Sequence, residues 1–232
     1  MIYIDEQNPP TAEDMLKSIA AEHAGRVVLA TSFGAEDQVL TELIVRNGLD
    51  IPLVTLDTGR LFEETYELWA RTEAHYGIRI RGYVPQAREV EALLQAQGTE
   101  GHRASAEARR ACCRVRKLVP LERALAGKQA WICGLRREQS PTRSDVAFSA
   151  EDAAHPGLVK YCPLADWSEG DVRRFIRAHD VPYNVLHDRG YPSIGCACCT
   201  RAVRYTEGLR DGRWWWESAD KRECGLHSRP RR

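Results

Sequence analysis

Short apolar runs alternate with amphipathic helical segments through most of the chain, and this alternation restricts the fold more than any other feature. Runs that suit strands occupy residues 26–31, 51–56, 78–84, 129–134 and 159–164. Helical periodicity covers residues 36–46, 61–76, 88–97, 112–125 and 171–179. Strands separated by helices need crossover connections, which favour parallel pairing. We therefore predict an α/β fold whose mainly parallel sheet carries helices on both faces.

The length and the continuity of this pattern predict a single domain. The chain has 232 residues, of which 43% are hydrophobic and 28% charged, and this composition excludes a largely disordered chain. We predict one domain over 1–232, made of an α/β core (1–181), an irregular segment rich in Cys, Arg and Trp (182–218) and a terminal tail (219–232). No apolar run approaches the ~20 residues of a membrane span, and the first residues do not resemble a secretion signal. We expect a cytoplasmic protein with no membrane partner.

Positive charge is concentrated in two blocks although the net charge is zero. Residues 101–145 contain eleven Lys or Arg and four Asp or Glu, and residues 196–232 contain nine and five. Such blocks suit an anionic ligand such as nucleic acid, nucleotide or sulfate, and they equally suit a solvated surface. Both blocks also contain clustered cysteines, which favours the ligand.

The segment Ser32–Asp37 joins the first predicted strand to a helix. In such a turn, Ser32 and Gly34 can direct backbone N–H groups and the positive end of the helix toward an anion. Many strand-to-helix turns contain Ser and Gly, so the turn alone does not establish a site. It matches neither the dinucleotide fingerprint nor the Walker loop. It resembles a modified pyrophosphate loop of the adenine-nucleotide hydrolase-like superfamily.

Five of the eight cysteines are clustered. Cys112 and Cys113 are adjacent, while Cys196 and Cys199 form a Cys-x-x-Cys motif with Cys198 inside it. In a cytoplasmic chain such clustering favours metal or redox chemistry, and four thiolates could hold zinc or a [4Fe–4S] cluster. Adjacent helical side chains diverge by roughly 100°, so Cys112 and Cys113 can share one centre only if it is broad or the backbone bends. A cubane, with separate iron corners, meets this condition more easily.

The remaining cysteines differ in context. Cys133 and Cys162 lie in apolar, strand-like segments, and we expect both to be buried and inert. Cys224 lies near the C-terminus, where a structural thiol would have little to pack against. Neighbouring Lys, Arg and His side chains would favour its thiolate, which is the nucleophilic form. The tryptophan run 214–216 is expected to anchor the irregular segment by packing.

Together these segments resemble the assimilatory adenylyl-sulfate reductases, the cluster-containing branch of the phosphosulfate reductase family. The matching segments follow the family's order over most of the chain, and they are residues 31–37, 56–59, 112–117, 134–137, 194–201 and 223–227. One departure is Cys198, because the family usually has Pro there. Cys198 is therefore a competing ligand in this chain.

The resemblance implies a specific chemistry. A [4Fe–4S] cluster would be held by four thiolates, those of Cys112, Cys113, Cys196 and Cys199. The substrate would be adenosine 5′-phosphosulfate, reduced to sulfite and AMP through an S-sulfocysteine on Cys224, with thioredoxin or glutaredoxin as the reductant. Segment 182–218 would then bind the cluster and the substrate, and the tail would carry the catalytic cysteine.

Charge and resemblance together also select a set of substrate-binding residues. The set comprises Ser32, Gly34, Asp57, Thr58, Gly59, Lys117, Arg137, Arg143, Arg210, Arg213 and His227. We further expect a homo-oligomer that binds no nucleic acid.

Two other classes of protein are weighed against this interpretation. A cluster-dependent tRNA thiolase shares the nucleotide-binding fold and would explain the basic blocks, but it needs the unmodified pyrophosphate loop and usually an added RNA-binding domain. Salt-sensitive binding of tRNA would favour it. A zinc-stabilised binding module would use the thiols without catalysis, and iron with acid-labile sulfide would exclude it.

Overall fold

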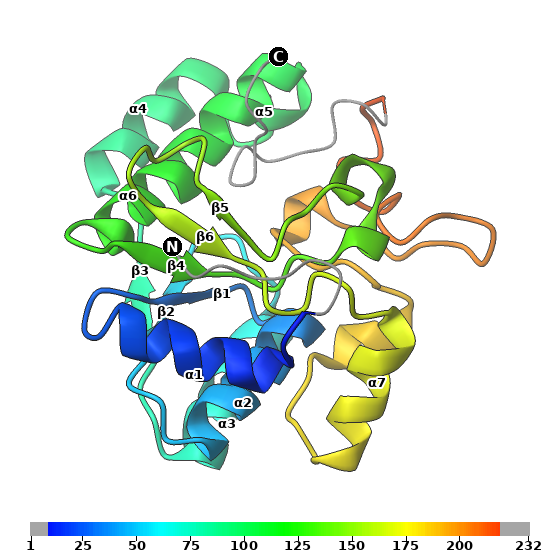
Figure 1. Ribbon diagram of the computed structural model, residues 1–232. Coiled ribbons are helices and arrows are strands. Elements are labelled where there is room, and N and C mark those ends of the chain that lie inside the picture. Colours follow the sequence, from blue (N-terminus) through cyan, green and yellow to red (C-terminus); the bar gives the residue numbers. More distant parts are fainter. Residues whose placement is uncertain (1–8, 219–232) are drawn as a thin grey trace.

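A six-stranded sheet forms the centre of the computed structural model, which describes residues 9–218 (Figure 1). The strand order is β3-β2-β1-β4-β6-β5. The strands are β1 (Leu29–Thr31), β2 (Leu53–Leu56), β3 (Arg81–Tyr83), β4 (Ala130–Ile132), β5 (Ser149–Glu151) and β6 (Val159–Tyr161). All neighbouring pairs are parallel except β5 with β6 at one edge. The predicted mainly parallel sheet is confirmed.

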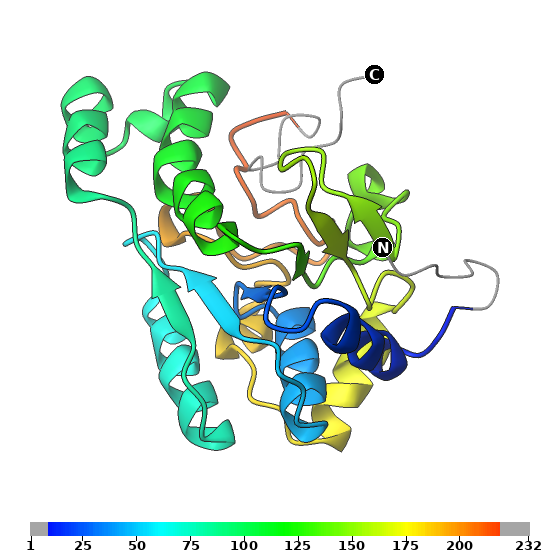
Figure 2. The same cartoon turned by 60° about the vertical axis from the view of Figure 1, so that its left-hand side comes forward.

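Helices cover both faces of this sheet. In the described residues they are α1 (Ala12–Glu22), α2 (Ala35–Arg46), α3 (Glu63–Tyr76), α4 (Ala87–Gln97), α5 (Ala106–Cys113), α6 (Val119–Leu125) and α7 (Glu169–Ala178). In Figures 1 and 2, α1, α2, α3 and α7 lie on one side of the sheet, and α4, α5 and α6 lie on the other. The prediction that helices lie on both faces of the sheet is therefore confirmed.

The centre of the sheet is buried from both sides. Val27, Val28 and Leu29 are fully inaccessible, and all three residues of β4 are buried. A strand covered on both faces needs a continuous apolar run rather than an alternating one, and both segments have it. The register Leu29↔Leu53 and Leu29↔Ile132 places β1 between β2 and β4, which makes β1 the middle of the parallel sheet.

The structure adds two elements to those predicted, α1 and β5. Thr11 caps α1 by accepting the Asp14 N–H at 3.1 Å, and Leu16 and Ile19 pack into the core. The signals for this helix, a Thr followed by acidic residues and helically spaced apolar ones, are present in the sequence. Strand β5 is mostly exposed at the sheet edge and carries no apolar pattern.

The helix predicted over 112–125 begins earlier and changes its winding in the middle. Ser105 caps α5 by accepting the Ala108 N–H at 3.1 Å. Directly after Cys113 the chain forms a π-helical turn, Arg114–Leu118, before α6 begins. Such turns are wider than an α-helical turn and are frequent at functional sites. The backbone thus departs from the α-helix immediately after the adjacent cysteine pair.

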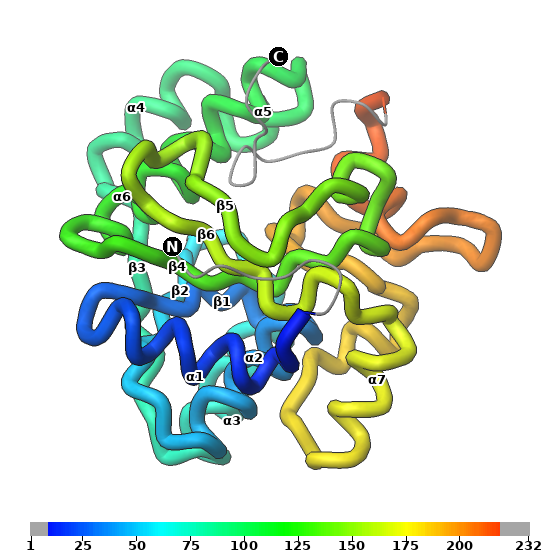
Figure 3. Tube along the Cα trace, viewed as in Figure 1, coloured from blue at the N-terminus to red at the C-terminus, as the bar shows by residue number. Residues whose placement is uncertain are grey.

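Beyond α7 the chain is irregular, as predicted. It forms short 3₁₀ turns at Val185–Arg189 and Ala197–Cys199, and Thr200 forms an isolated bridge with Arg213. Figure 3 shows this segment as a series of loops beside the sheet. The predicted tail 219–232 lies outside the described residues. None of the helices in residues 9–218 combines the length and the apolar character that crossing a membrane requires.

Candidate functional site

A cavity of about 340 Å³ opens at the carboxyl ends of the central strands. Its wall combines the turns after β1, β2 and β4 with the irregular segment 192–214. The chain runs outward from β1 through β2 to β3 and then returns to place β4 on the other side of β1. The crevice beside such a reversal of strand order is where open α/β sheets bind their ligands.

The turn after β1 is held in shape by a buried carboxylate. Asp37 Oδ2 accepts hydrogen bonds from Ser32 N at 2.6 Å and from Ser32 Oγ at 2.8 Å, and Asp37 Oδ1 accepts one from Gly134 N at 3.1 Å. Phe33 has a φ of 59°, and no side chain caps the N-terminus of α2 at Gly34. The first turn of α2 therefore offers backbone N–H groups at the cavity wall.

The pKa of Asp37 predicts a pH-dependent stability. Burial raises this pKa to about 6, although hydrogen bonds from Ser32 and Gly134 oppose the shift. Between about pH 4 and pH 6 the unfolded chain is ionised at this position while the folded chain still holds the proton, so stability falls as the pH rises. We expect Asp37 to contribute a loss on the order of 3 kcal/mol across this interval. Urea unfolding at several pH values should show that Asp37→Asn lacks this component, and equal pH slopes in both proteins would contradict the assignment.

Seven of the predicted substrate-binding residues line this cavity. They are Ser32, Gly34, Thr58, Lys117, Arg143, Arg210 and Arg213. Arg210 and Arg213 both reach Ser193 Oγ, at 3.5 and 3.2 Å. The guanidinium of Arg213 also packs directly against Gly195, where a side chain would collide with it. The structure thus gathers cations from distant parts of the sequence at one wall.

Three other residues of the predicted set do not line the cavity. Asp57 accepts hydrogen bonds from Tyr66 Oη at 2.6 Å and from Gly59 N at 2.9 Å, which closes the turn after β2. Arg137 donates to Val146 O at 2.7 Å and forms an ion pair with Asp166. The remaining predicted residues, Cys224 and His227, lie outside the described residues.

The two cysteine motifs meet beside the cavity. Cys113, at the end of α5, packs with Cys196, Cys199 and Trp214 in a small buried cluster. Burial raises the pKa of the Cys112 thiol, Arg116 opposes this shift and the nearby Cys196 adds to it. Thr58 Oγ1 lies 3.4 Å from Cys196 Sγ, which connects the turn after β2 to the same group. The fold therefore brings all four predicted ligands to one region, although the two cysteine motifs are far apart in the sequence.

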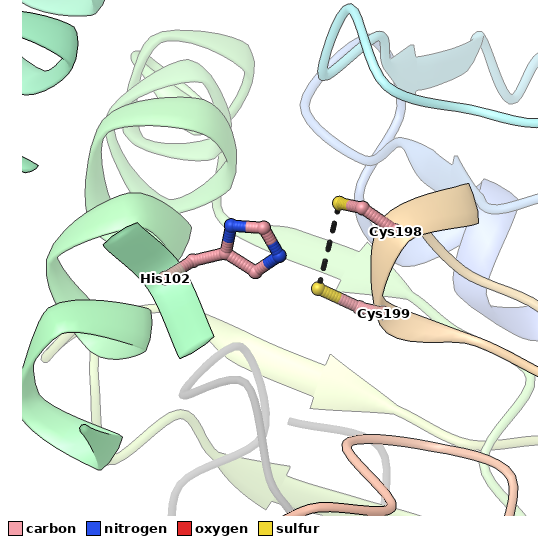
Figure 4. A group of neighbouring side chains, drawn as sticks. All are labelled: His102, Cys198 and Cys199. Carbon is pink, nitrogen blue, oxygen red and sulfur yellow. Dashed lines mark hydrogen bonds between the residues drawn. The ribbon is translucent and has the colours of Figure 1, made fainter. Parts of the chain in front are cut away.

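A tighter group lies at the edge of this region and includes Cys198. The ligand atoms of His102, Cys198 and Cys199 lie within 4.8 Å of one another, and Figure 4 shows the imidazole facing the two sulfurs. Zinc with Zn–S bonds of about 2.3 Å needs sulfurs about 3.8 Å apart. Among the described residues, only the group with His102 meets the 4.8 Å limit. In the described residues, no three of the four predicted thiols lie this close to one another, so they do not form a compact single-ion group.

Unpaired N–H donors around the cysteines also fit an iron–sulfur cluster. His102 Nδ1 accepts from Arg60 at 3.4 Å, so its Nε2 carries the proton. His102 Nε2, Trp214 Nε1 and Trp216 Nε1 are buried and have no hydrogen-bond partner among residues 9–218. Buried donors need acceptors, and the sulfurs of a cluster accept hydrogen bonds that tune its potential. The residues present therefore fit such a group.

A buried ion pair anchors the segment that follows the second cysteine motif. Arg109, fully buried on α5, binds both carboxylate oxygens of Glu217 at 2.6 and 3.0 Å. The guanidinium carbons of Arg109 and Arg213 lie over the indole of Trp214, 4.6 and 4.7 Å from ring centroids. Trp214 is 1% exposed, which agrees with the predicted packing role of the tryptophan run.

Removing one partner of this ion pair should destabilise the protein strongly. Glu217→Gln leaves the Arg109 charge buried without its counter-ion, and such a change costs about 3 kcal/mol or more. Chemical denaturation should show this loss. The matched control is Glu207→Gln, which breaks the more accessible, only partly buried pair with Arg201 and should cost less. Equal losses in the two variants would show that Glu217 is no anchor.

Sequence reasoning did not select several residues of this site. Asp37 was considered only as the end of a turn, and Ser193 and His187 line the cavity without carrying charge or a recognisable spacing. Arg109 and Glu217 are separated by 108 positions and resemble surface residues in the sequence. Only the fold shows that these side chains are buried together.

Sequence comparisons find relatives that cover most of this chain. The phosphoadenosine phosphosulfate reductase domain matches residues 26–202. The adenosine 5′-phosphosulfate reductase of Allochromatium vinosum is 54% identical over 95% of this chain and 87% of its own length. The enzyme of that name from Neisseria meningitidis serogroup A is 46% identical over 94% of this chain and 88% of its own.

Solved structures support the same fold. The phosphoadenylyl-sulfate reductase of Candida auris, crystallised as a phosphate complex, has a TM-score of 0.71 at 23% identity and covers 87% of this chain and 99% of its own. The FMN adenylyltransferase of Candida glabrata has a TM-score of 0.57 at 18% identity over 88% of this chain and 71% of its own. Domain match, identity and fold together show that the chain belongs to the phosphoadenosine phosphosulfate reductase family.

Proposed function

We propose that this chain reduces adenosine 5′-phosphosulfate to sulfite and AMP, with thioredoxin or glutaredoxin as the electron donor. The observation that carries the proposal is the single cavity that combines the turn after β1 with Lys117, Arg143, Arg210 and Arg213. The cavity is lined by more Lys and Arg than Asp and Glu side chains, which favours an anionic ligand. The names of the relatives, at 45–54% identity, support the choice of the nucleotide.

The cavity residues would bind the nucleotide part and the sulfate group of the substrate differently. The N–H groups at the start of α2 and the Ser32 hydroxyl would hold the nucleotide. The cations opposite would neutralise the phosphosulfate, because an anionic nucleophile approaches a sulfate group only when its oxygens are neutralised. Ser193, which accepts a hydrogen bond from each of them, would hold Arg210 and Arg213 near each other in the cavity.

We propose that the four thiolates of Cys112, Cys113, Cys196 and Cys199 hold a [4Fe–4S] cluster. When bound, the cluster supplies a charged and redox-capable iron centre next to the substrate. Lys117 lies on the π-helical turn that follows Cys113 and also lines the cavity, so this one side chain connects the two sites. Thr58, in the turn after β2, also connects the two sites, because it lines the cavity and its hydroxyl lies next to Cys196 Sγ.

The chemical step would use Cys224. Its thiolate attacks the sulfur of the sulfate group, the S–O bond to AMP breaks with its electron pair leaving on AMP, and a sulfonate remains on Cys224. A thioredoxin thiolate then attacks the Cys224 sulfur and displaces sulfite, and the second thioredoxin thiol resolves the mixed disulfide. His227, three residues further along, would add a cation beside the sulfate.

The homo-oligomer and the boundaries of the core, the irregular segment and the tail at residues 181 and 218 stay predictions.

A substrate comparison tests the proposed function. Sulfite release should require thioredoxin or glutaredoxin and should show a higher kcat/KM for adenosine 5′-phosphosulfate than for its 3′-phosphorylated relative. The reason is the pair of cysteine motifs, which marks the cluster-containing branch that the sequence resembles. A clear preference for the 3′-phosphorylated nucleotide would overturn the substrate assignment, and sulfite release without any thiol reductant would overturn the mechanism.

A further inference from the structure

Two thiols outside the proposed mechanism lie against each other at the base of the cavity. Cys133 directly follows β4 and Cys162 directly follows β6, two strands that pair in parallel with Ile132 opposite Tyr161. Their sulfurs are 3.6 Å apart, and one thiol donates a hydrogen bond to the other. Both residues are buried, as the sequence predicts, but Cys133 also forms part of the cavity wall.

This arrangement needs little change to become a disulfide. Neighbouring strands are about 4.8 Å apart, and disulfides join residues whose Cα atoms are about 4.4–6.8 Å apart. The two sulfurs would have to approach from 3.6 Å to about 2.05 Å, a movement that side-chain rotation and a small backbone shift can supply. The other cysteines of the described residues belong to the two cysteine motifs, and Cys113, Cys196 and Cys199 of these motifs pack in a separate cluster.

The two thiols are also chemically unequal. Burial opposes ionisation of Cys133, but the hydrogen bond from Cys162 and the charge of Lys160 lower the Cys133 pKa below its usual value. The same hydrogen bond, together with burial, raises the pKa of Cys162. Cys133 is thus the better nucleophile and is the one that reaches the cavity.

The backbone next to Cys133 is in tight contact with the turn after β1. Gly134 N donates to Asp37 Oδ1, and the same carboxylate holds Ser32. A Cβ placed on Gly134 would come within 2.6 Å of Asp37 Oδ1 and 2.7 Å of Glu36 Cβ, so there is no free space between this strand end and α2. A shift at Cys133 therefore has to move Asp37 and the turn that it holds.

We propose that Cys133 and Cys162 form a reversible disulfide, made by a small peroxide that enters through the cavity, and that this bond weakens ligand binding at the turn 32–37. The Cys133 thiolate attacks one oxygen of hydrogen peroxide, the O–O bond breaks, and a sulfenic acid and one water form after protonation. The Cys162 thiol then attacks the Cys133 sulfur and displaces the hydroxyl group, which leaves as a second water with the thiol proton. Two thiols lose two electrons in total and one peroxide gains them. A dithiol reductant reverses the bond by exchange.

Peptide mapping after controlled oxidation tests the proposal. Purified protein is treated with hydrogen peroxide, its remaining thiols are alkylated, and it is digested with trypsin. We expect the peptide 129–136 linked to the peptide 161–173, and we expect dithiothreitol to separate them. In Cys162→Ala the same treatment should instead leave a sulfenic acid on peptide 129–136, trapped by dimedone. Oxidation confined to the other six cysteines in folded protein would overturn the proposal.

A binding assay tests the route and the consequence, and this arm rests on the proposed function. AMP should slow formation of the linked peptides several-fold by filling the cavity. Oxidised wild type should bind AMP several-fold more weakly than reduced wild type. The AMP affinity of Cys162→Ala, which cannot form the disulfide, should be the same before and after the peroxide treatment. If AMP binds but does not slow the reaction, the cavity route is wrong, and if the linked protein keeps its AMP affinity, the coupling to the turn is wrong. Failure of the reduced protein to bind AMP at all would instead count against the proposed function.

Discussion

Cys224→Ser should abolish multiple turnover with adenosine 5′-phosphosulfate while leaving the iron content and the affinity for AMP unchanged. Serine is a far weaker nucleophile at neutral pH and cannot form the S-sulfocysteine, so we expect the rate of sulfite release to fall by at least ~10³-fold. The iron content should stay the same because Cys224 belongs to neither cysteine motif. Sulfite release, iron analysis and AMP titration on one preparation measure all three quantities.

The matched control for this variant is Ser228→Ala, which changes the same tail four residues further on. It should keep wild-type turnover because its side chain has no role in the proposed transfer. Full activity in Cys224→Ser would remove the basis of the mechanism. Loss of iron from the same variant would show that Cys224 belongs to the metal site.

Cys113→Ser should remove the iron and the brown chromophore together. Cys113 lies at the junction of α5 with the π-helical turn and packs against Cys196 and Cys199, so its loss removes one ligand from the centre of the group. Binding of a structural metal group contributes directly to folding free energy. The unfolding temperature should therefore fall as well. Visible absorption, iron and acid-labile sulfide measure the first effect, and thermal unfolding measures the second.

Cys198→Ala is the matched control, because Cys198 is the clustered thiol that the proposed ligand set leaves out. It should keep iron, sulfide and colour. This control is a stringent test of the proposed ligand set, because Cys198 lies close to Cys199 and His102 and could itself bind a metal. In the described chain these three residues form a group whose ligand atoms lie within 4.8 Å of one another. If Cys198→Ala loses the cluster and Cys199→Ala keeps it, the ligand register is wrong. Zinc without iron in the wild type would favour the single-ion group of Figure 4.

The sheet and its helices were predictable because their signals are local. Val27–Leu29 and β4 are continuous apolar runs, and the helices between them show apolar periodicity. The strand ends were less predictable, since β1 begins at Leu29 rather than at residue 26. Edge strand β5 gave no signal, because a mostly exposed three-residue strand has no face to bury.

The site was predictable only where residue type and spacing indicate the chemistry. The adjacent cysteines carry a geometric requirement, a broad centre or a bent backbone, and the structure has a π-helical turn directly after them. Contacts between segments that are distant in the sequence produce no pattern of residue type or spacing. The ion pair of Arg109 with Glu217 and the contact of Cys133 with Cys162 depend on which strand ends and helices the fold brings together.

The most direct test of the central claim is to find the sulfur intermediate on the protein. Wild-type protein is mixed with adenosine 5′-phosphosulfate without any thiol reductant and is then digested and analysed by mass spectrometry. The account predicts one sulfonate group per chain, located on the peptide that contains Cys224 and discharged as sulfite when reduced thioredoxin is added. A sulfonate on Cys133 or Cys162, or sulfite release from thioredoxin and substrate with no modified protein at any time, would contradict it.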